Sequence, residues 1–255
     1  MSQHSMGTYF PDHKATQQPA DIAVVMPTLA RPCITQAIRR VFEQDFVGRI
    51  QILIGVDIAE GDPAVIEAIA KQRPANVSLA LLQLPYSTSV RHGGVHTALD
   101  GGSLRSILSF MANAQYVAFL DDDNEWRSDH LSKLHAAIQG KAWAYSQRML
   151  VDMETNKDLG VDHWDSVGPN AGRFADQGGF VDTNCLMVDK IICARALGRW
   201  SESGTGKPGL TADRNFFSAI REAAHGAIDE PTVRYAIRAT NVLHTFLKQH
   251  AETLT

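Results

Sequence analysis

The chain has 255 residues, of which 44% are hydrophobic and 20% are charged, and its formal net charge is −4 at pH 7. These values are typical of a soluble globular protein, and they exclude intrinsic disorder, collagen and coiled coil as overall classes. The slight acidic excess also argues against a nucleic-acid partner, because phosphate recognition usually needs a basic surface.

The amino-terminal segment and the cysteines bear on location. Residues 1–20 contain no apolar stretch long enough for a secretory signal, and no segment approaches the length of a membrane helix. We interpret residues 1–20 as a flexible tail. The three cysteines, Cys33, Cys185 and Cys193, form no CxxC pair, which fits a reducing cytosol. The sequence therefore predicts a cytoplasmic protein without a transmembrane segment, for which peripheral membrane contact stays open.

From residue 21 onward, short β-rich runs alternate with helical patterns, which predicts βαβ units and a largely parallel sheet. Strands are expected over residues 22–28, 50–57, 77–85, 116–120 and 142–151. Helices are expected over residues 34–42, from Pro63 with Asp62 as the cap, from about Ser103, and after Ser128, which is the expected cap of the last one. A long loop joins the third strand to the helix at Ser103.

The second half of the chain is less regular. Residues 154–179 are rich in Gly, Asp and Asn without periodicity, which predicts a long surface loop of the kind that tends to be functional. A strand over 180–188, a short helix over 191–197, a flexible loop from Ser201 and a helix over 210–224 are expected next. No internal repeat or linker divides the chain, so we expect a single domain.

Three adjacent carboxylates, Asp121, Asp122 and Asp123, follow the strand at 116–120. The carboxyl end of a strand is where open α/β sheets bind ligands. Three neighbouring carboxylates repel one another unless a cation is present, and hard oxygen donors suit Mg²⁺ or Mn²⁺. This pattern predicts a divalent cation that holds phosphates. A solvated turn, in which Asp123 or Asn124 caps the next element, remains the alternative at this point.

Other phosphate chemistries are disfavoured by the motifs that are missing. The turn after the first strand, MPTLARP, has no acidic residue that could serve as the nucleophile of a haloacid-type phosphatase, and it lacks the GxGxxG fingerprint of dinucleotide enzymes. GTGKP, from Gly204, is not a phosphate-binding P-loop. Ser201 stands in place of its first glycine and Pro208 in place of its Ser or Thr.

Five motifs in order, VVMPTLARP, GVDIAEGD, YVAFLDDDNEW, LGRWSES and LTADRNFFSAI, resemble glycosyltransferase family 2 over roughly residues 21–224. The resemblance implies the GT-A fold, a Rossmann-like α/β sandwich with a mostly parallel central sheet in one two-lobed domain. Within residues 21–255, it assigns 21–125 to the nucleotide-binding half and 126–255 to the acceptor-binding half. The implied activity is transfer, with inversion, of a sugar from a nucleoside-diphosphate sugar to an acceptor hydroxyl, with Mn²⁺ or Mg²⁺ as cofactor.

The implied donor is a UDP-sugar. The implied acceptor is a saccharide, a lipid-linked molecule or another hydroxyl compound, as in bacterial surface polysaccharide or glycoconjugate synthesis. Asp57 is implied to bind the base or ribose. Asp123 is implied to bind the metal, and Asp121 to contact ribose or metal-bound water, with Asp122 pointing outward between them. The triplet permits two registers of this DxD pattern.

The resemblance also implies roles outside the triplet. Pro27 and Thr28 would lie beside the nucleotide, with Arg31 either close by or a surface charge. Arg105 would help neutralise the diphosphate. In the loop before it, Arg91, His92 and His96 are interpreted as solvated, although contact with phosphate is open.

Asp213 is the implied general base, since inversion needs one carboxylate to accept the proton of the acceptor hydroxyl. The family's usual Glu-Asp pair is Ala212-Asp213 here. His244 matches a carboxyl-terminal metal ligand of some members. Trp200 is expected in the core. Asp182, Thr183 and Asn184 precede the acceptor segment and are expected to contact the donor sugar or the acceptor.

Two alternatives remain beside the transferase. A nucleotidyltransferase of similar α/β build would need a Gly-rich, Arg-containing loop after the first strand, which MPTLARP does not supply. A nucleotide-sugar binding protein without turnover is favoured by the missing glutamate before Asp213.

Overall fold

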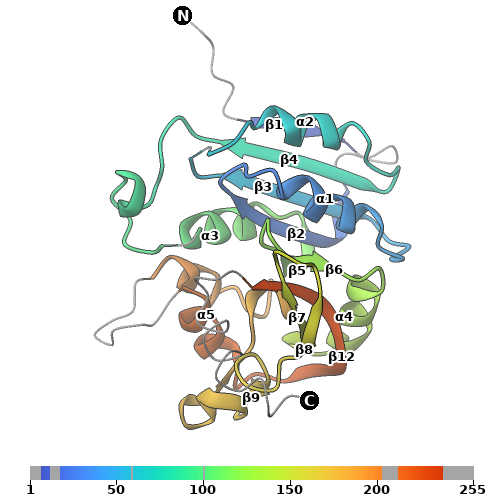
Figure 1. The fold of residues 1–255 in the computed structure, drawn as a ribbon, viewed down its shortest axis with the longest axis vertical. Coiled ribbons are helices and arrows are strands. Elements are labelled where there is room, and N and C mark those ends of the chain that lie inside the picture. The colour runs from blue at the N-terminus through green and yellow to red at the C-terminus, as the bar shows by residue number, and fades with distance from the viewer. Residues whose placement is uncertain (1–6, 12–17, 59, 100, 203–211, 238–255) are drawn as a thin grey trace, which may run out of the picture.

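The computed structural model describes residues 7–11, 18–58, 60–99, 101–202 and 212–237. Its first half is built around four parallel strands (Figure 1). They are β2 (Ala20–Thr28), β3 (Ile50–Val56), β4 (Val77–Gln83) and β5 (Ala114–Phe119), in the order β4-β3-β2-β5. β2 and β3 are buried over most of their length, as their continuous apolar sequences predict for strands that are covered on both faces.

Three helices cover this sheet. α1 (Ile34–Phe42) buries Ile34, Ala37, Ile38 and Val41, which confirms the face predicted from their spacing. α2 (Ala64–Ala70) packs beside α1. α3 (Gly102–Met111) contacts β2 and β3. Strand order reverses between β4 and β5, so right-handed crossovers put α3 on the sheet face opposite α1 and α2.

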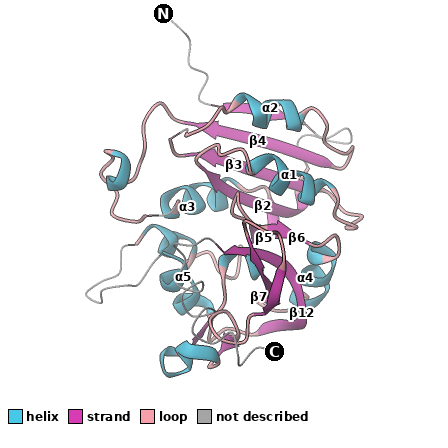
Figure 2. Cartoon of the chain, viewed as in Figure 1, coloured by secondary structure: helices cyan, strands magenta, loops and turns pink. Residues whose placement is uncertain are grey.

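The second half extends the same sheet (Figure 2). β11 (Leu186–Asp189) lies antiparallel between β5 and β7 (Trp143–Asp152). β12 (His225–Ile237) pairs parallel with β7 and antiparallel with β6 (Glu125–Trp126). α4 (His130–Ile138) and α5 (Ala212–Ile220) complete this half. The predicted mixed α/β fold with a mostly parallel central sheet in one domain is confirmed.

β12 is the longest strand that sequence periodicity did not indicate. Its register against β7 shifts on both sides of Pro231, so the apolar alternation that marks a strand is interrupted there. Asp229 and Glu230 add charge at the same irregularity.

Several boundaries in the second half differ from expectation. The predicted loop at 154–179 contains β8 (Asp158–Val161), β9 (Gly168–Pro169) and a 3₁₀ helix, η2 (Gly172–Gln177). The predicted strand at 180–188 is interrupted, because β10 (Gly179–Phe180) and β11 are separated by η3 (Thr183–Cys185). Residues 191–196 form turns before η4 (Leu197–Ser201).

Two smaller expectations also change. The cap of α4 is Asp129 rather than Ser128. Residues 7–10 belong to the predicted flexible tail, yet they form β1 (Gly7–Phe10), antiparallel to β4. The outer edge of β4 would otherwise leave its backbone N–H and C=O groups unpaired, and β1 satisfies them. No helix in the described part of the chain is long and apolar enough to cross a membrane.

Candidate functional site

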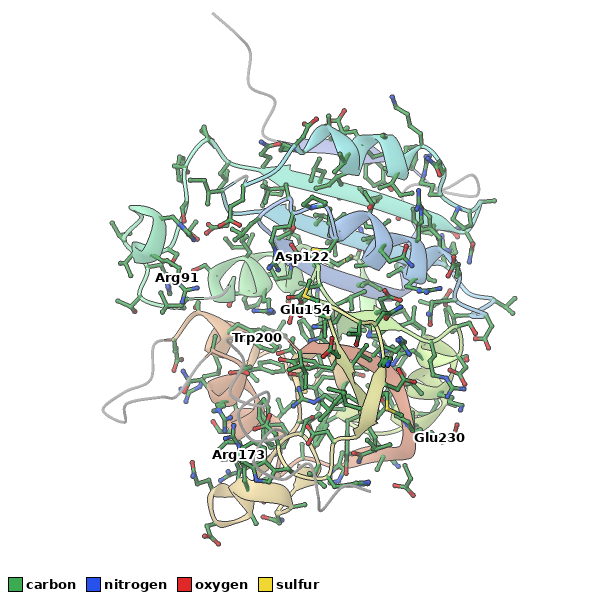
Figure 3. All side chains as sticks on the ribbon, viewed as in Figure 1. Arg91, Asp122, Glu154, Arg173, Trp200 and Glu230 are labelled. Atoms are coloured by element: carbon green, nitrogen blue, oxygen red, sulfur yellow. The ribbon has the colours of Figure 1, made fainter. Side chains whose placement is uncertain are left out.

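The carboxyl ends of β2, β3 and β5 border one cleft with a volume of about 380 Å³. β2 lies between β3 and β5, where the strand order reverses, and this is the position at which open α/β sheets bind ligands. Figure 3 shows Asp122 above Trp200, at the level where the two halves meet. The cleft brings together most of the predicted residues: Pro27, Thr28, Arg31, Asp57, Arg105, Asp121, Asp122 and Asp123.

Asp121 is held from two sides. Its Oδ1 accepts a hydrogen bond from the Arg105 guanidinium, and its Oδ2 accepts one from Asn184 Nδ2 at 3.0 Å. Its backbone N–H donates to Asn184 Oδ1 at 2.7 Å. The Asp121 side chain is 29% exposed, so it faces the cleft while both oxygens are anchored.

Asp122 points inward, which corrects the expectation that it points outward. Its side chain is only 3% exposed. Thr28 Oγ1 donates to its Oδ2 at 2.6 Å, and Arg31 binds both of its oxygens. Thr28 Oγ1 also accepts the N–H of Ala30 at 2.9 Å, so Asp122 organises the turn after β2. Asp122 therefore shapes the wall of the cleft from behind.

Arg31 is part of the cleft and not a simple surface charge. Burial lowers its pKa, but the hydrogen bond and charge of Asp122 outweigh this and raise the pKa above the ordinary value. Its Nη2 also lies 3.5 Å from Asp123 Oδ2. The Asp123 side chain is 18% exposed and accepts a hydrogen bond from Asn124 Nδ2 at 3.3 Å. Arg31 thus offsets part of the repulsion between two members of the triplet.

The side chains of the cleft could supply only some of the ligands of a divalent cation. Among the described residues, no group of three or more His, Cys, Asp or Glu side chains is arranged to hold a metal ion. Asp121 and Asp123 nevertheless offer hard carboxylate oxygens to the cleft. Mg²⁺ in nucleotide sites is typically held by one or two carboxylates plus substrate phosphates. The donor set therefore fits Mg²⁺ or Mn²⁺ together with a diphosphate.

Asp57 connects the end of β3 to the loop that follows β4. It is 7% exposed, and its carboxylate accepts hydrogen bonds from Ser87 Oγ at 2.8 and 2.9 Å and from the Thr88 N–H at 3.1 Å. The same loop brings Arg91 and His92 to the cleft, whereas His96 Nδ1 accepts the Ala98 N–H at 3.2 Å. Ser87 and Thr88 were not singled out in the sequence, because their contact with Asp57 spans about thirty residues.

Arg105 reaches Asp121 from the first turn of α3, where its guanidinium lies over the ring of Trp200 at 5.5 Å. Trp200 is fully buried and stacks on Phe216 of α5 at 4.1 Å, which confirms its predicted core position. α5 carries Asp213 in its first turn, so this aromatic stack connects the helix of Asp213 to the cleft. Asp213 does not line the cleft itself.

Ala212, which precedes Asp213, packs against the start of α3. It is 9% exposed, and its Cβ would lie 3.0 Å from a Cβ added at Gly102. A side chain at position 102 would therefore push against α5 at the start of α3. His244, the other predicted ligand, lies outside the described residues.

A buried charge cluster behind the triplet was not expected. Arg148, 1% exposed, binds three carboxylates, those of Asp162, Asp165 and Asp182, at 2.7 to 2.9 Å. Burial, which Arg148 offsets only in part, raises the pKa of Asp182 to about 6. Asn184, which accompanies Asp182 in the sequence, is buried against Asp121 instead of facing a substrate. The one sequence signal for this cluster is an arginine within the apolar strand at 142–151.

Comparisons with known proteins concern the fold. No model of a known protein family matches the chain, and no curated protein matches it. Solved structures do match. TarS of S. aureus (residues 1-349), in complex with UDP, matches with a TM-score of 0.62 at 14% identity, over 85% of this chain and 60% of that chain. The same protein in complex with UDP-GlcNAc matches with a TM-score of 0.60 at 14% identity, over 88% of this chain and 61% of that chain.

A mannosyltransferase from Pyrobaculum calidifontis, PcManGT in complex with GDP-Man and Mn²⁺, matches with a TM-score of 0.58 at 15% identity. That match covers 94% of this chain and 63% of the other. The chain therefore spans 60 to 63% of the length of these neighbours. At such identities the likeness establishes the fold alone, which is the GT-A glycosyltransferase fold.

Proposed function

We propose that this GT-A chain is an inverting glycosyltransferase that moves a sugar from a nucleoside-diphosphate sugar to an acceptor hydroxyl. The observation that carries the proposal is the cleft at the carboxyl ends of β2, β3 and β5, where carboxylates and arginines converge. Neighbours of the same fold were solved with UDP, UDP-GlcNAc or GDP-Man, which supports a nucleotide-sugar donor. We propose UDP as the nucleotide and a hexose-type sugar.

The residues of the cleft have distinct roles in this proposal. Asp123 and Asp121 hold the cation in a DxD arrangement, since both face the cleft while Asp122 is buried. Arg105 and Arg31 bring positive charge to the diphosphate. Asp57 positions the loop beside the base or ribose, next to Pro27 and Thr28.

Transfer requires one bond to form and one to break. The acceptor oxygen attacks the anomeric carbon, the bond from that carbon to the diphosphate oxygen breaks, and Asp213 accepts the hydroxyl proton. A bound Mn²⁺ or Mg²⁺ supplies charge neutralisation of the departing diphosphate. A second carboxylic acid is therefore not required. His244 stays a proposed additional ligand.

The acceptor belongs to the same proposal: a saccharide, a lipid-linked molecule or another hydroxyl compound, with peripheral membrane contact where the acceptor is a lipid. A cytoplasmic location is supported by the free, partly or fully buried cysteines. A second candidate, a nucleotide-sugar binding protein without turnover, is favoured by Ala212, which leaves Asp213 without its usual acidic neighbour.

Metal-dependent nucleotide binding tests the first step. Calorimetric titration of UDP, and of GDP in parallel, should show binding that strengthens when Mn²⁺ is added. Asp123→Ala should weaken the Mn²⁺-dependent binding at least tenfold, because it removes a ligand oxygen. Asp45→Ala is the matched control, since this exposed aspartate precedes β3 at the opposite end of the strands. Equal binding with and without Mn²⁺ would contradict the assignment of Asp121 and Asp123 as metal ligands. If neither nucleotide bound, the proposed transferase function would be wrong.

Turnover tests the second step. Asp213→Asn should leave nucleotide binding unchanged and slow donor hydrolysis or transfer by roughly 10² to 10⁴-fold, the usual contribution of a general base. A panel of UDP- and GDP-sugars is assayed for both reactions. If Asp213→Asn turned over its donor at the wild-type rate, the assignment of Asp213 as the general base would be wrong. Binding without turnover of any donor by the wild type would favour the second candidate.

A further inference from the structure

Asn184 stands between the cleft and the buried charge cluster. Its side chain is fully buried, and Nδ2 donates to Asp121 Oδ2 at 3.0 Å and to Asp182 Oδ1 at 2.8 Å. Its Oδ1 accepts the Asp121 N–H at 2.7 Å. Its backbone N–H donates to Asp182 Oδ1 at 2.9 Å, and its carbonyl accepts from Trp126 Nε1 at 2.9 Å. Every polar group of Asn184 is thus engaged.

The position uses one acceptor and two donors of a single side chain, and a carboxamide supplies them. Asp121 presents both a backbone donor and a carboxylate acceptor to the same side chain, so the partner must accept and donate at once. An ionised carboxylate only accepts, and an aliphatic side chain does neither. The orientation of the amide follows from these partners, because reversal would face its NH₂ group toward an N–H and its oxygen toward two carboxylates.

Asp182, the second hydrogen-bond partner of the Asn184 amide, is held in place by a buried ion pair. Asp182 Oδ2 accepts from Arg148 Nη1 at 2.8 Å, and the Arg148 guanidinium lies over the Tyr235 ring at 4.0 Å. Arg148 is a residue of β7, and its other nitrogens donate hydrogen bonds to Asp162 and Asp165. Moving such a buried ion network exposes uncompensated charge, so it resists displacement.

We propose that Asn184 is a positioning residue that holds Asp121 in the orientation required for donor binding, by tying it to the cluster of Arg148, Asp162, Asp165 and Asp182. Arg105 holds the other oxygen of Asp121, so the carboxylate is fixed from both sides. This inference rests on the proposed function, because it concerns the donor affinity of that cleft. Asn184 itself contacts no substrate.

Asn184→Asp tests the proposal with little change of shape. The new carboxylate faces those of Asp121 and Asp182 and can no longer donate to either. Titration with UDP and Mn²⁺ should give a Kd at least tenfold higher than for the wild type. Asn76→Asp is the matched control, because the amide of Asn76 also donates a hydrogen bond within the protein, to the Gly48 carbonyl at 2.8 Å, near the opposite ends of the strands. The control should bind as the wild type does.

A second variant separates positioning from stability. Asn184→Asp combined with Asp182→Asn restores the net charge of the pair and supplies a donor between positions 182 and 184. It does not restore the donor toward the Asp121 carboxylate. Thermal melting should therefore recover part of the Tm lost in Asn184→Asp, since Asp182→Asn removes a repulsion but also weakens the contact with Arg148 Nη1, whereas the Kd for UDP with Mn²⁺ should stay at least tenfold raised.

The outcomes are distinguishable. If the wild type binds neither UDP nor GDP with Mn²⁺, the proposed function fails and the inference falls with it. If the wild type binds and Asn184→Asp binds equally well, the inference alone is overturned. Recovery of Tm and affinity together in the double variant would also overturn it, because Asn184 would then be merely structural.

Discussion

Adjacent residues of the acidic triplet have different surroundings. Asp122 is 3% exposed and bound by Thr28 and Arg31, whereas Asp121 and Asp123 retain 29% and 18% exposure. Asp122 and Asp123 lie in a turn after β5, which the Asn124 N–H closes onto the Asp121 carbonyl, and this turn directs the outer two carboxylates toward the cleft and the middle one into the protein. This alternation favours Asp121 and Asp123 as the pair that meets a ligand.

The stability of the fold should depend on His130 in acid. Burial lowers the pKa of His130 to about 3 from 6.5, so the folded state keeps it neutral while the unfolded state takes up a proton below pH 6.5. The contribution of neutral His130 to the free energy of unfolding is fully present above pH 6.5. As pH falls from 6.5 toward 3, the free energy of unfolding decreases by about 1.4 kcal/mol per pH unit.

A comparison with His130→Phe isolates this effect. The variant keeps an aromatic ring against Trp126 but loses the 2.6 Å hydrogen bond to Thr232, so it should be about 1 to 2 kcal/mol less stable at pH 7. Urea unfolding at several pH values should show this gap closing and then reversing as pH falls below 6.5. A gap that stays constant down to pH 4.5 would contradict the prediction.

At the scale of elements, the start of α3 fixes the geometry of the cleft. Gly101 has a φ of +76° and approaches Pro27 so closely that a Cβ would lie 2.7 Å from the proline Cβ. Gly102 lies against the carbonyl of Trp200 and the side chain of Ala212. These close approaches place the amino terminus of α3, with its partial positive charge, beside the triplet. α3, η4 and α5 therefore depend on one another.

Gly102→Ala should disturb this junction. The added Cβ meets the backbone oxygen of Trp200, which cannot move without displacing η4, so we expect a loss of about 1 to 3 kcal/mol in the free energy of unfolding. Gly198→Ala is the matched control, since no atom lies within 4 Å of its added Cβ, and it should change stability by less than about 0.5 kcal/mol. Chemical denaturation measures both, and equal stabilities would contradict the close approach.

At the scale of the molecule, one sheet runs through both halves. Within the described residues it has ten strands, and β5 of the first half pairs directly with β11 of the second. Phe119 of β5 packs against Trp200 and Phe216, with ring centroids 4.9 and 5.7 Å apart. The cores of the two halves are therefore continuous, which agrees with the single domain expected from the sequence.

Unfolding should accordingly be a single transition. All four tryptophans lie at position 126 or later, so their fluorescence reports on the second half, whereas far-UV circular dichroism reports on the whole chain. Because the halves share sheet and core, both signals should change together in urea with one midpoint. A dichroism phase without a fluorescence change would show that the first half unfolds separately.

The sequence alone determined β2 to β5 and α1 to α3 of the first half, though not β1, and the position of the acidic triplet. These follow from local periodicity and from the rule that parallel strands end at one edge. Contacts between distant segments required the tertiary structure. Thr28 meets Asp122 across 94 residues, and Asn184 meets Asp121 across 63. Sequence periodicity indicates which face of a segment is buried, but it does not identify the distant residues that this face contacts. Those contact residues decide how each carboxylate of the triplet is held.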